Sequence, residues 1–250
     1  MNSILRTALV AMVSTACLLA ADLTITYNST VKGMGRTVEG VQTHYYNANF
    51  QKTVDEGTQT DTLVDYGKGV FYTINHKDKK IESMTFDDMV AMAEAMEAKM
   101  GQMANMPAIV QNMMGGGAKG DVKVEPLGDD TVAGRTCKKY KLTLGKMIQE
   151  LSLDPSLKPP INPAAYAKFA KLKSVMGGPA AAGLKKMTEE LSKLQGMALK
   201  TQMKGFMGMD SNMVATEVKT TAIAASVFAL PAGYKTEDIG KKMLKDLQKS

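Results

Sequence analysis

The feature that most constrains the fold is an alternation of apolar and polar residues that recurs along the chain in short runs. In the first run, Leu23, Ile25 and Tyr27 alternate with threonine and asparagine. Side chains of a strand point alternately to its two faces, so such a run predicts a half-buried strand. Turn-forming residues separate the runs roughly every eight to twelve residues, and one such turn is expected at 128–130. Similar runs resume near residue 122 and again at 197–222. The pattern predicts an antiparallel meander of about ten strands, with no internal repeat.

Between the two groups of strands the hydrophobic period changes to that of a helix. Thr85 can cap this helix, and Asp88 stands three residues later, which suits a capping box. The helical segment is expected to occupy about 86–106, because Pro107 cannot continue a helix. It therefore forms an insertion between strands of one sheet.

A second helical insertion is expected at 146–195, beginning with a short helix at 146–151 and including a helix near 165–176. Thr236 is expected to cap a final helix. Strands on both sides of the helical segments predict one domain over 22–250. The predicted fold class is α+β, a curved antiparallel sheet with helices over one face.

The first 21 residues are typical of a secretory signal peptide. Arg6 supplies the positive end, Ala8–Leu19 is apolar, and small residues follow. Lipidation at Cys17 is the alternative, but the residues before it lack the leucine expected of that signal. We favour cleavage, which predicts a periplasmic or secreted protein.

Composition excludes several kinds of chemistry. The chain has two His and two Cys, too few for a rich zinc site or an iron–sulfur cluster. No nucleophile elbow, zinc-protease or phosphate-loop motif is present, and His44, His76 and Cys137 are each interpreted as structural. We therefore predict no enzyme activity and no cofactor.

The net charge of +6 comes from basic residues spread among acidic ones. Such a mixture is typical of a solvated surface, and no aromatic residues accompany a basic patch as in nucleic-acid-binding proteins. We predict no nucleic-acid partner, and contact with a membrane surface or an envelope protein is the weaker alternative.

Methionine is the unusual residue, with 21 in the chain. Five methionines at helical spacing form one stripe: Met89, Met92, Met96, Met100 and Met103. A second group (Met197, Met203, Met207, Met209 and Met213) lies in the last predicted hairpin.

The stripe has three interpretations. It can be ordinary core packing, it can line a cavity for an apolar ligand, or it can bind Cu(I) through thioether sulfurs. A straight stripe spreads its sulfurs over about 20 Å, and no His accompanies it, which disfavours copper.

Three segments resemble the bacterial DUF4412 family and, more widely, the LolA-like periplasmic lipoprotein-carrier set. They are LVDYGKGVFYTINHKDKKIESMTFDDM at 63–89, GDDTVAGRTCKKYKLTLG at 128–145 and ASVFALPAGYKTED at 225–238. The resemblance implies an unclosed β-barrel with helices on its concave side. In LolA-like proteins the cavity holds acyl chains. The family offers no catalytic residues to carry over, and the two helical insertions here imply an enlarged lid.

Together these features predict a non-enzymatic protein that binds a lipid or acyl chain in a cavity between sheet and helices. Met89, Met92, Met96, Met100 and Met103 are the candidate lining. The alternatives are an envelope interaction protein with a filled core and a Cu(I)-binding protein.

Overall fold

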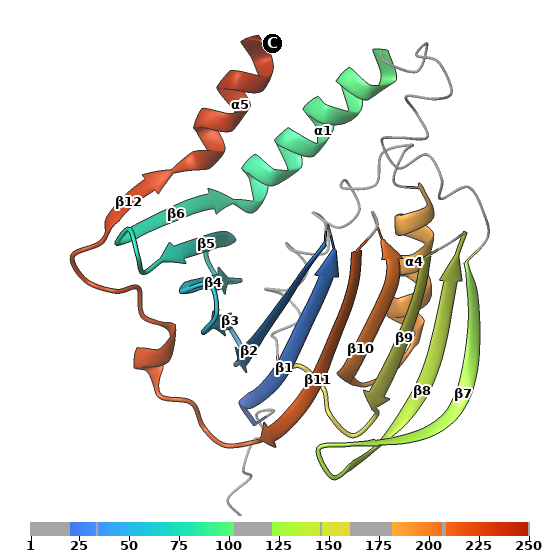
Figure 1. The fold of residues 1–250 in the computed structure, drawn as a ribbon. Helices are drawn as coiled ribbons and strands as arrows, with labels where there is room; N and C mark the ends of the chain where they lie inside the picture. The colour runs from blue at the N-terminus through green and yellow to red at the C-terminus, as the bar shows by residue number, and fades with distance from the viewer. Residues whose placement is uncertain are drawn as a thin grey trace, which may run out of the picture.

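The computed structural model describes residues 21–33, 35–102, 122–145, 147–160, 182–206 and 209–249. These residues form one curved, twelve-stranded sheet with helices on its concave side, as expected (Figure 1). The strand order is β12-β6-β5-β4-β3-β2-β1-β11-β10-β9-β8-β7. Neighbouring strands are antiparallel except β12 and β6, which are parallel. Two more strands are present than the sequence predicts.

The sheet consists of two meanders that meet in its middle. The first contains β1 (Leu23–Gly33), β2 (Arg36–Tyr46), β3 (Phe50–Asp55), β4 (Thr60–Asp65), β5 (Val70–Asn75) and β6 (Lys80–Thr85). The second contains β7 (Lys123–Val132), β8 (Arg135–Leu144), β9 (Met147–Asp154), β10 (Met197–Phe206) and β11 (Met209–Lys219). The last strand, β12 (Lys235–Asp238), adds to the edge of the first meander. Pairing of β1 with β11 joins the meanders.

Three helices and one short turn complete the described residues. They are α1 (Phe86–Gln102), α4 (Ala182–Lys193), α5 (Ile239–Lys249) and the 3-10 turn η3 (Ala225–Phe228). The helix α1 begins as predicted. The Asp88 amide donates to Thr85 Oγ1 at 3.0 Å, and the Thr85 amide donates to Asp88 Oδ2 at 3.3 Å. These two bonds are a capping box.

Strands β3 to β6 repeat a ten-residue unit, whereas the sequence pattern predicts no internal repeat. The strands are six residues long, and they begin at residues 50, 60, 70 and 80. Each connecting turn starts with a side-chain oxygen that accepts a bond from a turn amide: Asp55 from Gly57, Asp65 from Lys68, Asn75 from Asp78. The last turn residue has positive φ in each case: Gln59, Gly69 and Lys79. Identical turns keep the four strands in strict register.

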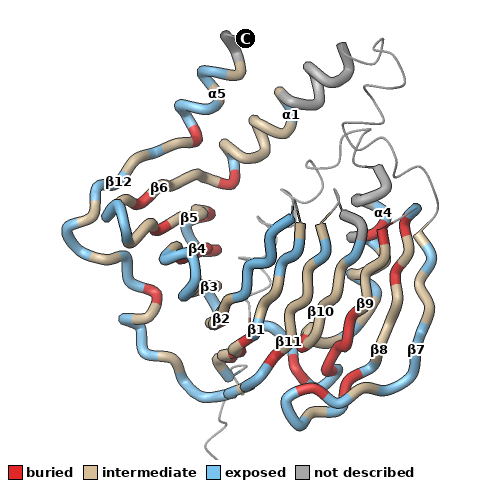
Figure 2. The backbone as a smooth tube through the Cα atoms, viewed as in Figure 1, coloured by how far each residue is buried: buried red, intermediate tan, exposed pale blue. Residues whose placement is uncertain are grey.

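The core divides into clusters on the two faces of the sheet (Figure 2). We call the face that α1 and α4 contact the inner face. On it, Met187 of α4 packs against Leu142, Leu151 and Leu153. On the outer face, η3 and its flanking residues cover Leu63, Ile74 and Ile81 through the buried ring of Phe228. A further cluster lies where β1 meets β10 and β11 (Leu23, Ile25, Tyr27, Leu199, Ala215).

Three local predictions were wrong. Residues 146–151, expected as a short helix, contain the start of β9, which pairs with β8 and β10. The turn expected at 128–130 is a bulge inside β7 at Gly128. Thr236 does not cap a helix, because it lies inside β12 and the last helix begins at Ile239. In each case pairing with another strand decided the local structure.

Other predictions fall outside the described residues. These include residues 1–20 of the predicted signal peptide with Cys17, the end of the first insertion at 103–106 and the helix expected near 165–176. In the part of the chain that the structure describes, no helix has the length and apolarity needed to cross a membrane.

Candidate functional site

The first turn of α1 is anchored in the inner face of the sheet. Phe86 is buried and packs with Val64 and Tyr66, and Met89 is packed against this group together with Phe71. The β6–α1 junction is therefore a fixed point from which the rest of the helix projects.

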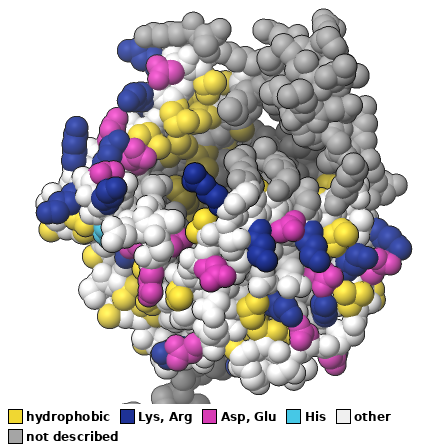
Figure 3. Space-filling view, viewed as in Figure 1, with side chains coloured by type: hydrophobic (Ala, Val, Ile, Leu, Met, Phe, Trp, Pro, Cys, Tyr) yellow, Lys and Arg dark blue, Asp and Glu magenta, His cyan; other side chains and the backbone are white. Residues whose placement is uncertain are grey.

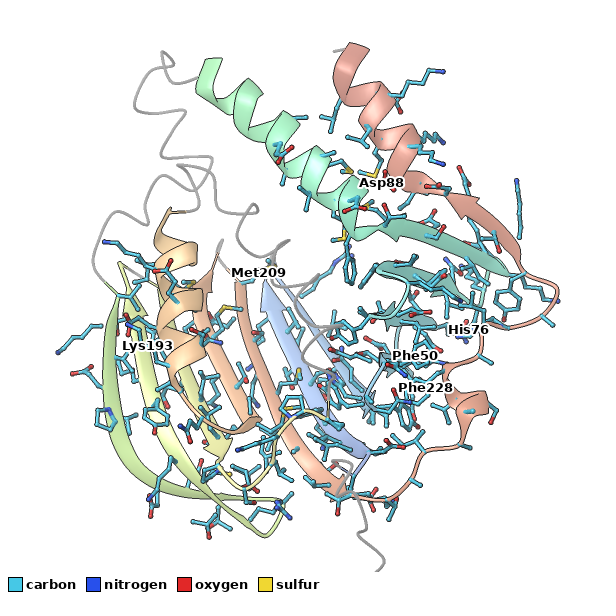
Figure 4. The ribbon with its side chains drawn as sticks, turned by 180° about the vertical axis from the view of Figure 1, so that it is seen from behind. Phe50, His76, Asp88, Lys193, Met209 and Phe228 are labelled. Atoms are coloured by element: carbon cyan, nitrogen blue, oxygen red, sulfur yellow. The ribbon has the colours of Figure 1, made fainter. Side chains whose placement is uncertain are left out.

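Beyond this anchor α1 leaves the sheet and runs beside α5 across the open end of the curl (Figure 1). Gly240 at the start of α5 lies against Asp88 at the start of α1. Figure 4 shows the two helices from behind, rising together from β6 and β12. Hydrophobic side chains gather where the two helices lie together, with a hollow beside them (Figure 3). The helix pair is thus attached at one end and spans a hollow.

The predicted stripe divides along α1. Met89 belongs to the core cluster at the anchor, whereas Met92 is half-buried and belongs to none of the four clusters of described residues. Met96 and Met100 lie on α1 at the expected spacing, but only their backbone is described, and Met103 lies outside the described residues. The structure thus leaves the stripe untested as a ligand site.

Across the hollow, the inner face of the central strands carries small and flexible side chains. Met213 pairs directly with Ser29, and Ser211 pairs with both Val31 and Met203. The methionines Met203, Met209 and Met213 are half-buried. The sequence alone predicts no site for this methionine group, because only the strand register shows which face it occupies.

One row of hydrogen-bonding side chains crosses the inner face of the first meander. Direct pairing aligns His44, Thr53, Thr62, Thr73 and Glu82 on five adjacent strands. We call Thr53, Thr62 and Thr73 the hydroxyl row. Thr62 and Thr73 stand two residues from Val64 and Phe71, so they share the face that α1 contacts. All three threonines are half-buried, and none of their hydroxyls has a hydrogen-bond partner among the described residues.

A directed chain of hydrogen bonds fixes His44 at one end of this row. Gln42 Nε2 donates to Asp55 Oδ2 at 3.0 Å, so Gln42 Oε1 faces His44 Nε2 at 3.4 Å. An amide oxygen only accepts, so His44 carries its proton on Nε2, and the Tyr46 hydroxyl donates to Nδ1 at 3.1 Å. Burial lowers the pKa of His44 to about 4, so the ring is neutral at pH 7.

The other histidine holds the outer face together, as its structural interpretation predicts. His76 Nδ1 lies 3.0 Å from the Tyr234 hydroxyl, and His76 Nε2 lies 3.0 Å from Asp61 Oδ2. Asp61 is buried and also pairs with Lys52 at 3.2 Å. These contacts tie two of the resembling segments, the one that contains Tyr234 and the one that contains His76, to each other. Both motifs therefore have a structural role, and we call this set of contacts the His76 clamp.

The remaining candidates for chemistry are weak. Cys137 is fully buried, and burial raises the pKa of its thiol, which opposes a nucleophilic role. No group of three or more His, Cys, Asp or Glu side chains suits a metal ion within the described ranges. A depression of about 160 Å³ beside Thr30, Lys32 and Met203 is smaller than the ligand pockets of most proteins.

Charged residues on the outer face of the second meander are paired across strands. Lys139 lies 2.8 Å from Glu150, and Lys141 lies 4.0 Å from Glu125. Figure 3 shows basic and acidic side chains next to one another over the second meander. The mixture agrees with the predicted solvated surface.

Comparisons with solved structures give distant likenesses. The chain is similar to an uncharacterized conserved protein from Thermus thermophilus, with 10% identity, a TM-score of 0.45, and coverage of 88% of this chain and 91% of that chain. It is similar to MucB in the complex of Pseudomonas aeruginosa MucA and MucB (11%, TM-score 0.42, coverage 87% and 58%). It is also similar to a putative outer membrane lipoprotein-sorting protein domain from Vibrio parahaemolyticus (10%, TM-score 0.36, coverage 90% and 92%). Likenesses at this level carry no argument about function.

Sequence comparison is more decisive. No curated protein matches the chain. Residues 44–234 match the family described as "Domain of unknown function (DUF4412)". This match covers most of the chain and includes the hydroxyl row, the His76 clamp and the second meander. The protein belongs to the DUF4412 family.

Proposed function

We propose that this protein is a non-enzymatic, extracytoplasmic carrier that holds an apolar ligand, such as an acyl chain, between the inner face of the sheet and α1. The observation that carries the proposal is the course of α1. Among the described residues α1 packs on the inner face of the sheet through its first turn, and from there it runs beside α5 past a hollow. A stripe that packed only as core would be expected to follow the sheet.

The chemistry of the two walls supports the same proposal. Met92 stands on one side, and Met203 and Met213 stand on the inner face of the central strands. Methionine side chains are flexible and polarisable, so they adapt to apolar partners of varied shape. Burial of an acyl chain there would supply about 25 cal/mol per Å² of apolar area. The predicted signal peptide supports a location outside the cytoplasm.

Native mass spectrometry of protein extracted gently from its own envelope tests this proposal. A carrier is expected to retain a lipid adduct, whereas a clean apo mass would favour the interaction protein with a filled core. The neutral fluorophore N-phenyl-1-naphthylamine gives a second test. Its affinity is expected to fall at least about fivefold in Met92→Lys, because a charge enters the apolar wall.

Glu94→Lys is the matched control, since Glu94 is an exposed residue on the same helix and should leave binding unchanged. Equal affinities of the two variants would contradict the proposed wall. Replacing the five stripe methionines with leucine separates packing from sulfur chemistry: a carrier keeps its ligand, and a Cu(I) protein loses its metal.

A further inference from the structure

The hydroxyl row gives the inner wall a chemical character that the proposed function does not require. Thr53, Thr62 and Thr73 stand directly opposite one another on three strands, with their hydroxyls unpaired among the described residues. Neighbouring strands lie about 4.8 Å apart, so the hydroxyls form an evenly spaced line of donors and acceptors.

The cation on this part of the inner face is already neutralised. Lys80 Nζ lies 2.7 Å from Glu82 Oε1 and 2.9 Å from Glu237 Oε2. On β2 to β6 the strands pair from residues 42–46 of β2, through β3, β4 and β5, to residues 80–84 of β6. Within these paired residues, Lys80 is the one Lys or Arg on the same face as the hydroxyl row. An anionic group bound against the threonines would therefore lack a free cation to pair with on the paired residues of these five strands.

The carboxylates of the same face are also engaged. Glu82 and Glu237 share Lys80, and Asp55 accepts bonds from Gln42 Nε2 and from the amides of Gly57 and Thr58. His44 adds no charge, because its ring stays neutral within its hydrogen-bonded chain. A cationic group would thus compete with partners that are already in place.

From this juxtaposition we infer that the inner wall is a head-group site for a neutral amphiphile. In this site the hydroxyl row hydrogen-bonds an uncharged polar head, such as a glyceryl or glycosyl group, while the methionine side of the hollow takes the acyl chain. The inference rests on the proposed function and adds the class of ligand. A partly buried charge without a partner is unfavourable, so head groups of either sign should bind more weakly.

Three ligands with the same lauroyl chain test the charge selectivity: 1-lauroylglycerol (neutral), laurate (anionic) and lauroylcholine (cationic), each competing with N-phenyl-1-naphthylamine. We expect 1-lauroylglycerol to compete about tenfold better than either charged ligand. Equal or better competition by laurate or lauroylcholine overturns the inference while leaving the carrier proposal intact. Failure of all three to compete, with no fluorophore binding, counts against the carrier itself.

Variants of the row make the test specific. The triple change Thr53→Val, Thr62→Val and Thr73→Val keeps the β-branched shape and removes the hydroxyls, so it should abolish the preference for the glyceryl head. Thr62→Lys should instead make laurate the best competitor, since it supplies the missing cation.

The control is the double change Thr26→Val and Thr43→Val. These two threonines pair with each other on the opposite face of β1 and β2, so the preference should persist. Circular dichroism checks that each variant is folded. A triple variant that is folded and keeps the full preference overturns the inference.

Discussion

At the scale of single residues, His44 makes stability depend on pH. Its pKa is about 4 in the folded chain and near 6.5 when exposed, because burial disfavours the charged ring. Between these values the unfolded state binds the proton more strongly, so stability falls as pH drops. We expect a loss of about 2 kcal/mol between pH 7.5 and pH 5, measured by urea unfolding.

Controls separate this effect from those of other groups. His44→Gln should flatten the profile in this window. Hydrogen bonds from their partners lower the pKa of Asp130 and Glu150. The stability that these two carboxylates contribute is therefore lost at lower pH than the window of His44. Equal wild-type stability at pH 7.5 and pH 5 would show that His44 titrates normally.

A second prediction at the residue scale concerns the repeated turns. Gln59 has φ of 53° at the position where the next turn uses Gly69, with φ of 68°. A side chain in the left-handed region costs about 1 kcal/mol, which glycine avoids. Gln59→Gly should therefore raise the free energy of unfolding by about 0.5 kcal/mol, and the matched change Gly69→Ala should lower it. Calorimetry that showed a lower stability for Gln59→Gly, or a higher stability for Gly69→Ala, would contradict this account of the turns.

At the scale of elements, the junction between α1 and α5 depends on one glycine. A Cβ at Gly240 would lie 2.6 Å from Asp88 Oδ2, and Asp88 cannot move freely because it completes the capping box of α1. Gly240→Ala should destabilise the protein by about 1–3 kcal/mol and speed hydrogen exchange in both helices. Gly40→Ala is the control, since its Cβ would come no closer than the 3.5 Å that separates it from Ser29 Oγ. Unchanged exchange in α1 and α5 would refute the contact.

Helices and strands could be predicted from sequence where the residues that determine them lie close together in the chain. The capping box of Thr85 and Asp88 lies within one turn of chain, and its prediction was confirmed. By contrast, β9 begins with two apolar residues, Met147 and Ile148, followed by two polar ones, so the start of the strand lacks the alternation that would have revealed it. The hydroxyl row was invisible for a related reason. Its members share a line only because two successive hairpins have the same register.

At the scale of the whole molecule, the outer face of the sheet is linked to the helix pair that spans the hollow. The buried ring of Phe228 stacks on Phe50 with 5.4 Å between centroids, and Tyr234 is held by His76. Directly after Tyr234, β12 begins to pair with β6, and α5 continues from it beside α1. The segment around Phe228 therefore fixes the position of α5, and through α5 that of α1. Sequence could not predict this link, because it depends on parallel pairing of segments about 150 residues apart.

Phe228→Ala tests the link. Removal of a buried aromatic ring should lower the free energy of unfolding by about 3–4 kcal/mol, and Leu230→Ala, in the same segment but 39% exposed, should cost less than about 1 kcal/mol. If the helices move as one body, Phe228→Ala should also speed hydrogen exchange in α1, although Phe228 does not belong to the cluster that anchors that helix. Faster exchange confined to β12 and α5 would mean that α1 is held by its anchor at Phe86 alone. Access to the hollow would then be independent of the outer face.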